Sequence, residues 1–310
     1  MERKARAFSP AGISSFFEIC DRTVDGKPIS DLERVGARGG GYAFEKGVLT
    51  AVSVEEANEA RLQIFINDKP SPEAETTRTV AETLLRNCNQ AYDVVIRHKV
   101  DVPIGAGFGS SAAGALGTAF ALHKALGLSL TYNQLGRIAH VAEVKCHTGL
   151  GTVSPLLLGG CVITLEPGAP GYSVIDRIPL ADDYRIVAGV FRPLPTKEVL
   201  ALAEIRQKVN KCGRETVDKI LACPSLENLL GASKEFAVKS GFATQRVLKL
   251  IELAERAGAI GAAQNMVGEA VHAVTTEDNV ENVIQAFKKA LPQESILNGK
   301  IDFQSVRLLS

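Results

Sequence analysis

The sequence Pro-Ile-Gly-Ala-Gly-Phe-Gly-Ser-Ser-Ala-Ala, residues 103–113, decides the fold. An alternating apolar run over residues 92–102 ends just before it, and a long Ala- and Leu-rich helical pattern begins inside it. Gly105, Gly107 and Gly109 free the backbone to adopt positive φ angles and to approach a ligand closely. A strand, a glycine loop and a helix N-terminus together form a phosphate-binding site, because free N–H groups and the helix dipole favour an anion.

The serines of this stretch strengthen that interpretation. Ser110 is predicted at the N-cap of the helix that follows. The stretch is not a Walker A loop, because no Gly-Lys-Ser/Thr sequence closes it, and it does not match Gly-x-Gly-x-x-Gly. A flexible turn before a buried helix would explain the glycines but not the paired serines, so phosphate binding is favoured.

Composition indicates a globular chain that holds two domains. The 310 residues include 45% hydrophobic and 23% charged residues, which are ordinary values. With 35 basic and 35 acidic residues there is no electrostatic footprint for nucleic acid. Six cysteines without a Cys-x-x-Cys pair argue against zinc and disulfides and favour a reducing, cytoplasmic location. No export signal or membrane span is predicted, and a homodimer is the common state of soluble enzymes of this size.

The N-terminal part contains a second glycine-rich stretch. Residues 4–8 are predicted as a short strand that residues 9–12, Ser-Pro-Ala-Gly, bring to an end. Gly39, Gly40 and Gly41 within residues 34–41 predict a loop that bends sharply or approaches a ligand. Arg38 in this stretch has the planar fork that binds a carboxylate or phosphate. An exposed hairpin loop with solvated arginines is an equal alternative.

Regular elements follow from hydrophobic periodicity and capping signals. Strands are predicted over residues 48–54, 61–66 and 92–102, and helices over 72–88, 111–126 with a C-cap at Gly127, and 131–146 with a capping box at Thr131. On the last helix, His140, Glu143 and His147 share one face. A solvated polar face is the usual explanation. Zinc is conceivable, but the sequence has no His-Glu-x-x-His motif.

The second half of the chain predicts an α+β layer that resembles a ferredoxin-like sandwich. A turn over residues 192–196 places Thr196 at a helix N-cap. The predicted elements are strands over 184–191, 270–274 and 300–308 and helices over 197–210, 216–221, 226–239, 243–257 and 280–290.

Residues 103–113 resemble the ATP-phosphate loop of the GHMP kinase superfamily. The resemblance implies a two-domain α+β GHMP kinase fold, with a ribosomal protein S5 domain 2-like N-terminal domain over residues 1–180 and a ferredoxin-like C-terminal domain over residues 181–310. It implies ATP and Mg²⁺ as cofactors. The residues expected to bind the nucleotide are Pro103, Gly105, Ala106, Gly107, Phe108, Gly109, Ser110, Ser111 and Ala112.

The metal is expected between the phosphate helix and the next one. Magnesium takes one or two carboxylates together with phosphate oxygens. GHMP kinases hold it with a glutamate of the following helix and a serine of the loop. Glu143 and Ser111 occupy those places in this chain, so both are predicted as metal ligands and catalytic residues.

A narrower resemblance is to the archaeal pantoate kinase family. Its pattern is similar to Ala-His-x-Ala-Glu-Val followed by Thr-Gly-Leu-Gly-Asp-Val, and residues 139–144 and 148–153 read Ala-His-Val-Ala-Glu-Val and Thr-Gly-Leu-Gly-Thr-Val. The N-terminal Ser-Pro segment, the Pro-Gly-Ala-Pro-Gly at residues 167–171 and the Gln-Asn-Met at residues 264–266 are also similar to that family. The resemblance implies phosphorylation of the primary hydroxyl of pantoate to 4-phosphopantoate in coenzyme A biosynthesis.

One position departs from the family. Thr152 stands where the pattern has Asp, the candidate general base. Phosphoryl transfer through a loose transition state depends mostly on positioning and charge stabilisation, so a kinase without this base remains feasible. The candidates for binding the small hydroxy acid are Arg38, His140, Arg192 and Thr196. The alternatives are a kinase for another small alcohol, such as homoserine or a mevalonate derivative, and a nucleotide-binding protein without transfer activity, which Thr152 would support.

Overall fold

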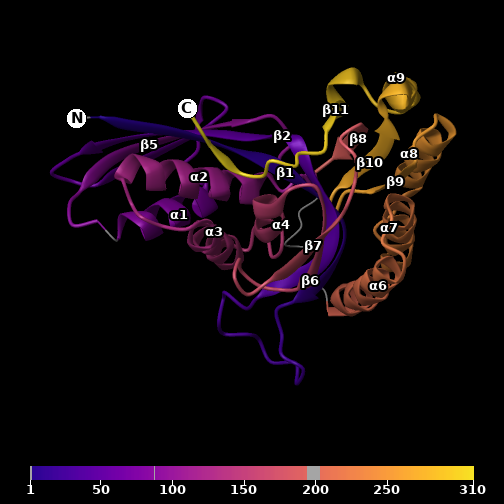
Figure 1. Cartoon of the computed structure of the whole chain (residues 1–310), viewed down its shortest axis with the longest axis horizontal. Helices are drawn as coiled ribbons and strands as arrows, with labels where there is room; N and C mark the ends of the chain where they lie inside the picture. The colour runs from indigo at the N-terminus through magenta and orange to yellow at the C-terminus, as the bar shows by residue number, and fades with distance from the viewer. Residues whose placement is uncertain (1, 87, 194–202) are drawn as a thin grey trace.

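The computed structural model describes residues 2–86, 88–193 and 203–310. Thr196 and the predicted turn and helix start around it lie outside these residues. Two sheets, each covered by helices, stand side by side in Figure 1, with the first half of the chain at one end and α6, α7 and α8 at the other. The fold is α+β, as predicted.

The first sheet has eight strands, seven of them from residues 3–178 and one from the end of the chain. Five strands of the main path lie in the order β12-β1-β2-β5-β3, with β4 at the edge beyond β3, and β6 and β7 continue from β2. Neighbours are antiparallel except β3 and β5, which are parallel. The strands are β1 (Arg3–Cys20), β2 (Gly36–Glu56), β3 (Arg61–Ile66), β4 (Lys69–Pro70), β5 (Tyr92–Val100), β6 (Cys161–Glu166), β7 (Val174–Ile178) and β12 (Arg307–Leu309).

The first two strands are longer than predicted. The prediction that residues 9–12 end the first strand is wrong, because β1 continues through them with register shifts at Pro10/Ala11 and Ser14/Phe16. Such bulges accommodate a proline in a strand. The loop predicted over residues 34–41 is also wrong from Gly36 onward, where β2 begins. A Cβ on Gly41 would lie 1.9 Å from the Ile13 carbonyl oxygen, so this glycine permits close strand approach rather than a bend.

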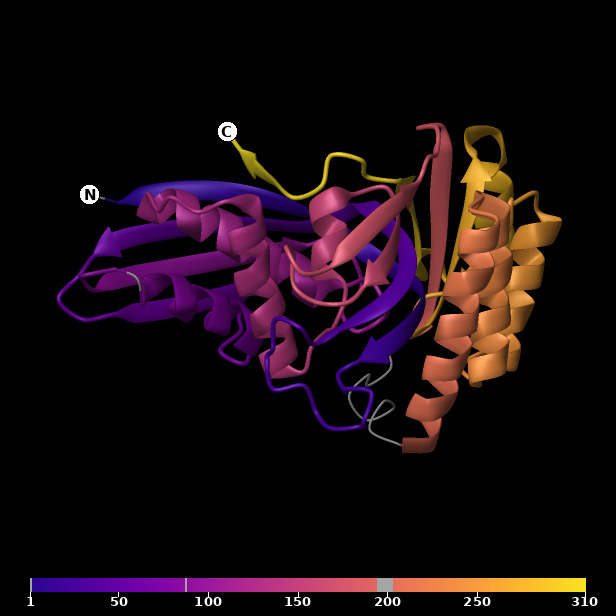
Figure 2. The same ribbon diagram turned by 60° about the horizontal axis from the view of Figure 1, so that its bottom comes forward.

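Four helices cover one face of the first sheet (Figure 2). They are α1 (Glu75–Leu85), α2 (Ser110–Leu126), α3 (Tyr132–Cys146) and α4 (Val153–Leu158). Thirteen of the 17 residues of α2 are buried, which confirms the predicted central helix. Its C-cap is Gly127 and α3 opens with the capping box of Thr131, both as predicted. Gly117 lets α2 approach the sheet, since a Cβ there would lie 2.2 Å from Thr50 Oγ1.

The second half has the predicted ferredoxin-like arrangement. Its strands are β8 (Tyr184–Arg192), β9 (Gly261–Gln264), β10 (Glu269–Thr276) and β11 (Ile296–Lys300), and its helices are α6 (Ala203–Ala222), α7 (Leu226–Ser240), α8 (Gln245–Arg256) and α9 (Val280–Lys288). The antiparallel order β11-β8-β10-β9 interleaves the strands as a βαββαβ unit requires. The two helices predicted over 197–210 and 216–221 are one helix, α6, from Ala203 onward.

The last residues return to the first sheet. The strand predicted over 300–308 is wrong, because β11 ends at Lys300 and the chain then crosses to pair Leu309 with Arg6 of β1. Figure 1 shows the C-terminus on the same sheet as the N-terminus. The domain division at residues 180/181 stays a prediction, but the segment that contains β12 pairs with the first domain rather than the second. Among the described residues, no helix is both long and apolar enough to cross a membrane.

The two halves share a hydrophobic core. Phe236 of α7 is buried and packs edge-on against Phe16 and Phe17 of β1, with ring centroids 6.4 and 5.7 Å away. Gly213 of α6 lies so close to β1 that a Cβ on it would meet the Phe17 carbonyl oxygen at 2.2 Å. Direct packing of α6 and α7 on β1 places the second half against one side of the cavity described next.

Candidate active site

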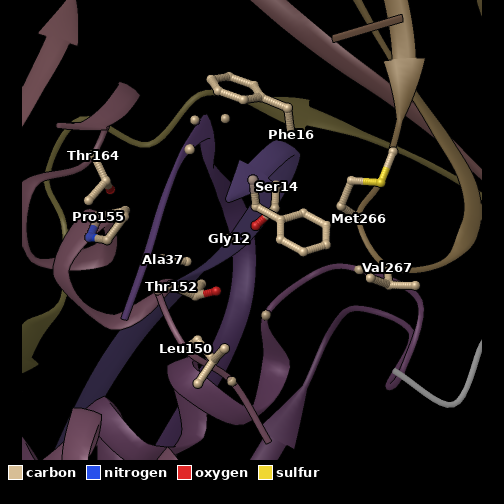
Figure 3. Close-up of a pocket in the computed structure, with 18 of the residues that line it drawn as sticks. Gly12, Ser14, Phe16, Ala37, Leu150, Thr152, Pro155, Thr164, Met266 and Val267 are labelled. Carbon is tan, nitrogen blue, oxygen red and sulfur yellow. The ribbon is translucent and has the colours of Figure 1, made fainter. Parts of the chain in front are cut away.

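A cavity of about 390 Å³ lies where the two halves meet. Figure 3 shows Gly12 and Ser14 of β1 near the middle of the view, Phe16 above them, Leu150 and Thr152 on one side, and Met266 and Val267 on the other. Its walls are largely apolar, and Ile13, Phe17 and Leu156 are among the lining residues. A mostly apolar cleft between two units, with few polar groups, is typical of small-molecule sites.

The predicted phosphate loop opens onto this cavity. Gly105, Gly107 and Gly109 line it and have φ angles of +76°, +78° and +57°, so the predicted left-handed backbone is confirmed. Gly109 is the N-cap of α2, whereas Ser110 is its first residue, so the prediction of Ser110 as N-cap is wrong. Because no side chain caps α2, the free N–H groups at the N-terminus of this helix are available to donate hydrogen bonds to an anion.

The other residues of the loop hold it in place. Ala106, Phe108 and Ala112 are buried in the core, and Pro103 is half-buried. The Phe108 carbonyl accepts a hydrogen bond from the Gly12 N–H at 2.9 Å. These apolar side chains anchor the loop, and the glycines between them present its backbone to the cavity.

The loop from residue 265 to residue 268 presses on the phosphate loop from the second half of the molecule. A Cβ on Gly107 would lie 2.9 Å from Asn265 Cβ, and a Cβ on Gly268 would lie 2.7 Å from the Ala106 carbonyl group. His272 holds Asn265, with Nδ1 2.9 Å from Asn265 Oδ1 and Nε2 3.0 Å from Ser15 Oγ of β1. Burial lowers the pKa of His272 to about 3, so it acts as a neutral hydrogen-bonding group. No motif in the sequence indicates this connection between the two halves.

Ser111 and Glu143 meet beside the phosphate loop. The Ser111 hydroxyl donates to Glu143 Oε1 at 2.5 Å, and the Thr148 hydroxyl donates to the same oxygen at 2.6 Å. Glu143 is only 3% exposed, and burial raises the pKa of its carboxyl, while both hydrogen bonds oppose that shift. The two residues predicted to share a metal are therefore in contact, although they stand 32 residues apart.

This group of side chains fits magnesium. It offers hard oxygen donors, and none of the described residues forms a cluster of three His, Cys, Asp or Glu that would hold a softer metal. The backbone of Gly149 lies against the other carboxylate oxygen of Glu143, since a Cβ there would be 2.2 Å from Oε2. One carboxylate and hydroxyls leave coordination places for phosphate oxygens and water, as Mg²⁺ requires.

The two histidines near Glu143 differ in position. His140 is 1% exposed and its Nε2–H donates to the Val35 carbonyl at 2.8 Å, so it supports the chain just before β2. It does not line the described part of the cavity wall. His147, at the C-cap of α3, does line it. The alternative explanation, a solvated polar face, does not hold for His140 and Glu143, because both are buried.

Of the predicted acceptor-binding residues, Arg38 reaches the cavity and Arg192 does not. Arg38 lines the wall, and its Nε and Nη1 donate to the Leu165 carbonyl at 2.8 Å and to Glu18 at 3.1 Å. Arg192 lies outside the lining of the described part and pairs with Glu269 at 2.7 Å. Hydrogen bonds from Arg246, which has the larger effect, and from Arg192 lower the pKa of the Glu269 carboxyl to about 2. Thr196 falls outside the described residues.

Thr152 lies against the phosphate loop. It is the N-cap residue of α4 and lines the cavity, with its methyl group packed between β1 and the loop: a Cβ on Gly12 or on Gly109 would come within 2.4 or 2.7 Å of it. The position that carries Asp in the family pattern is therefore beside the predicted phosphate loop.

Asp21 is the one carboxylate of the described cavity lining, and Arg206 binds it. Asp21 and Arg206 were not predicted as site residues, because neither stands in a motif.

Comparison with known proteins agrees with this geometry. The GHMP kinases N terminal domain family matches residues 75–160, which contain the phosphate loop and Glu143. A homoserine kinase structure from Cytophaga hutchinsonii covers all of this chain and 98% of its own, with a TM-score of 0.70 at 16% identity, and so shares the fold. The fold is that of the GHMP kinase class, and the matched part of the chain contains the glycine loop.

More similar relatives narrow the class. The pantoate kinase of Methanocaldococcus jannaschii is 30% identical over 284 residues, which cover 92% of this chain and 97% of the relative. That of Thermococcus kodakarensis is 31% identical over 285 residues, with 90% of each covered. A solved structure described as a "Phosphotransferase related to CoA biosynthesis pathway" has a TM-score of 0.88 at 27% identity and covers 98% of its own chain. The chain belongs to the pantoate kinase family, which confirms the resemblance predicted from the sequence.

Proposed function

We propose that this protein transfers the γ-phosphoryl group of ATP to the primary hydroxyl of pantoate and so forms 4-phosphopantoate, a step of coenzyme A biosynthesis. The observation that carries the proposal is the contact of Ser111 with Glu143 at the mouth of a left-handed glycine loop, in a chain of this family. The named activity of the M. jannaschii and T. kodakarensis relatives supports the acceptor. A cytoplasmic homodimer without nucleic-acid or membrane partners is part of the proposal.

The residues divide into three roles. The backbone of residues 105–109 and the N-terminus of α2 would bind the phosphates, with Ser110 beside them. Ser111 and Glu143 would hold Mg²⁺, which when bound offsets charge on the transferring phosphoryl group. The apolar wall would enclose the dimethyl carbon of pantoate, and Arg38 would contact its polar groups.

The described lining of the cavity offers no free carboxylate as a general base. In the described lining Asp21 is bound to Arg206, and Thr152 carries a hydroxyl that stays protonated near neutral pH. The acceptor proton therefore passes to the phosphoryl group itself. A loose transition state suits this path, because little charge develops on the attacking oxygen before the bond to the leaving group breaks.

Exchanges at Thr152 test this path. We expect Thr152→Ala to keep kcat within roughly tenfold of wild type, because the hydroxyl takes no proton. Thr152→Asp should raise kcat, since a positioned base contributes about 10²–10⁴ in rate. ADP release from Mg-ATP is measured with pantoate, with homoserine and with mevalonate as acceptors.

The same acceptor panel tests the activity. Turnover with pantoate above the other alcohols is the expected result, and a preference for homoserine or mevalonate would change the acceptor. Binding of Mg-ATP without ADP release for any of the three would leave a nucleotide-binding protein. A kcat for Thr152→Ala lowered by more than a hundredfold would contradict the proposed proton path.

A further inference from the structure

An ion pair from the two halves of the molecule faces the cavity. Asp21 follows the end of β1, and Arg206 stands in the second turn of α6. Arg206 Nη2 lies 2.5 and 2.6 Å from the two carboxylate oxygens of Asp21, and both side chains line the cavity. Their side chains are 24% and 30% exposed, so the pair is half-buried at the site rather than on the outer surface.

The guanidinium of Arg206 has donors left over. Both hydrogen bonds to Asp21 come from Nη2. Within the described parts of the chain, no hydrogen bond involves Nε or Nη1 of Arg206. Arg38, the other arginine of the cavity, has already committed Nε and Nη1 to Leu165 and Glu18. A planar guanidinium with unused donors is the group that proteins use to bind carboxylates. Arg206 therefore keeps two neighbouring nitrogens, Nε and Nη1, without a partner in the described residues, whereas Arg38 keeps only Nη2.

The charged side chains in the described lining carry one more positive than negative charge. Two arginines but a single carboxylate line the described part of the cavity. Glu18, which lies behind Arg38, is shared with Arg214 on the outer surface at 3.3 Å. An acceptor that carries one carboxylate would balance this excess in a cavity whose other walls are apolar, where an unbalanced charge is costly.

Arg206 is not needed to dock α6. Arg206, Asn210 and Arg214 stand at i, i+4 and i+8 on the face of α6 that meets β1. The Asn210 side chain alone bonds both the N–H and the C=O of Ile19, at 2.9 and 3.0 Å. Arg214 adds its contact to Glu18. Since Asn210 and Arg214 already join the helix to the strand, the guanidinium of Arg206 is available to bind a ligand in the cavity.

We infer that Arg206 binds the carboxylate of the acceptor and that Asp21 orients its guanidinium for this purpose. The inference rests on the proposed function and specifies the acceptor as an alcohol with one carboxylate. The hydroxyl end of the acceptor would then face the phosphate loop and its carboxylate the N-terminal part of α6. Acceptor binding would thus involve both halves of the molecule.

Arg206→Gln, with Arg214→Gln as matched control, tests the inference. Both exchanges remove an arginine of α6 that pairs with a carboxylate at or just after the end of β1, but Arg214 lies outside the described cavity lining. Because charge-assisted hydrogen bonds are lost, Arg206→Gln should raise the KM for pantoate by about 10- to 100-fold, and leave the KM for ATP unchanged. Arg214→Gln should change both by less than about twofold, as surface ion pairs do.

A second acceptor separates carboxylate binding from a structural effect. A diol that keeps the dimethyl carbon chain but lacks the carboxylate should be phosphorylated equally by wild type and Arg206→Gln. An equal loss with the diol, or a KM for pantoate like that of Arg214→Gln, would overturn the inference. So would an unchanged KM in Arg206→Gln together with a raised one in Arg38→Gln, because the carboxylate would then bind at Arg38.

Calorimetry with the hydroxy acid alone distinguishes this inference from the proposed function. Pantoate that binds to wild type and not to Arg206→Gln would support the carboxylate site even if no ADP were released, and the kinase proposal alone would then fail. Turnover of pantoate with equal binding to both proteins would retain the kinase and reject the role of Arg206. Failure of the wild type to bind any hydroxy acid would contradict the inference.

Discussion

Gly107→Val is expected to abolish Mg-ATP binding, with an affinity lowered by more than about 100-fold, because it changes the backbone that would surround the phosphates. The φ angle of Gly107 is +78°, a region that costs a side-chain-bearing residue roughly 1–3 kcal/mol. A Cβ would also lie 2.9 Å from Asn265 Cβ, so the loop would have to move away from its support. Calorimetric titration with Mg-ATP measures the loss.

Gly127→Val is the matched control. Gly127 has a φ angle of +69°, but nothing lies within 4 Å of a Cβ built on it. The exchange thus introduces similar backbone strain at the other end of α2 without blocking the loop, and it should leave the affinity for Mg-ATP within about threefold. Circular dichroism compares the folding of both variants. If Gly107→Val fails to fold, Gly105→Val replaces it, because the nearest contact there is 3.3 Å to Pro193. Wild-type affinity in a folded loop variant would show that these glycines only form a turn.

The phosphate loop was predictable because its information is local. Glycine itself permits the positive φ angles at residues 105, 107 and 109, and the caps at Gly127 and Thr131 depend on their immediate neighbours. The helical period placed Glu143 on a helix next to the loop, and the family resemblance then indicated its contact with Ser111. Such local conformational preferences are kept in the folded protein because the tertiary contacts are consistent with them.

The acceptor end of the site depends on contacts that the sequence does not encode locally. Asp21 and Arg206 are 185 positions apart, and neither stands in a motif. The predicted break at residues 9–12 was wrong because these residues pair with β2 and so continue β1. The two register shifts that allow this pairing depend on both strands and cannot be read from residues 9–12 alone. The buried position of His140 likewise involves a hydrogen bond to the Val35 carbonyl, 105 positions away, which periodicity along one helix does not reveal.

Glu143→Gln is expected to lower kcat by about 10²–10³, because the positioned charge that would hold Mg²⁺ is lost. The exchange keeps the shape of the side chain, and the Ser111 and Thr148 hydroxyls can still donate to the amide oxygen. Raised Mg²⁺ should restore part of the rate, since the remaining oxygen ligands bind the ion more weakly. Steady-state ADP release at several Mg²⁺ concentrations measures both effects.

The stability of Glu143→Gln should change in the opposite direction to its activity. Burial raises the pKa of Glu143 in the folded protein, so keeping the carboxylate ionised there costs free energy of folding once the pH exceeds the pKa of the unfolded chain. A neutral amide removes that cost, and Tm near pH 7 should be equal to or above that of wild type. Thr148→Val, which removes one donor to the carboxylate but no charge, is the matched control and should keep kcat within about tenfold. Wild-type turnover of Glu143→Gln at ordinary Mg²⁺ would contradict the metal assignment, whereas a loss of activity together with a fall in Tm would indicate that Glu143 supports the fold instead.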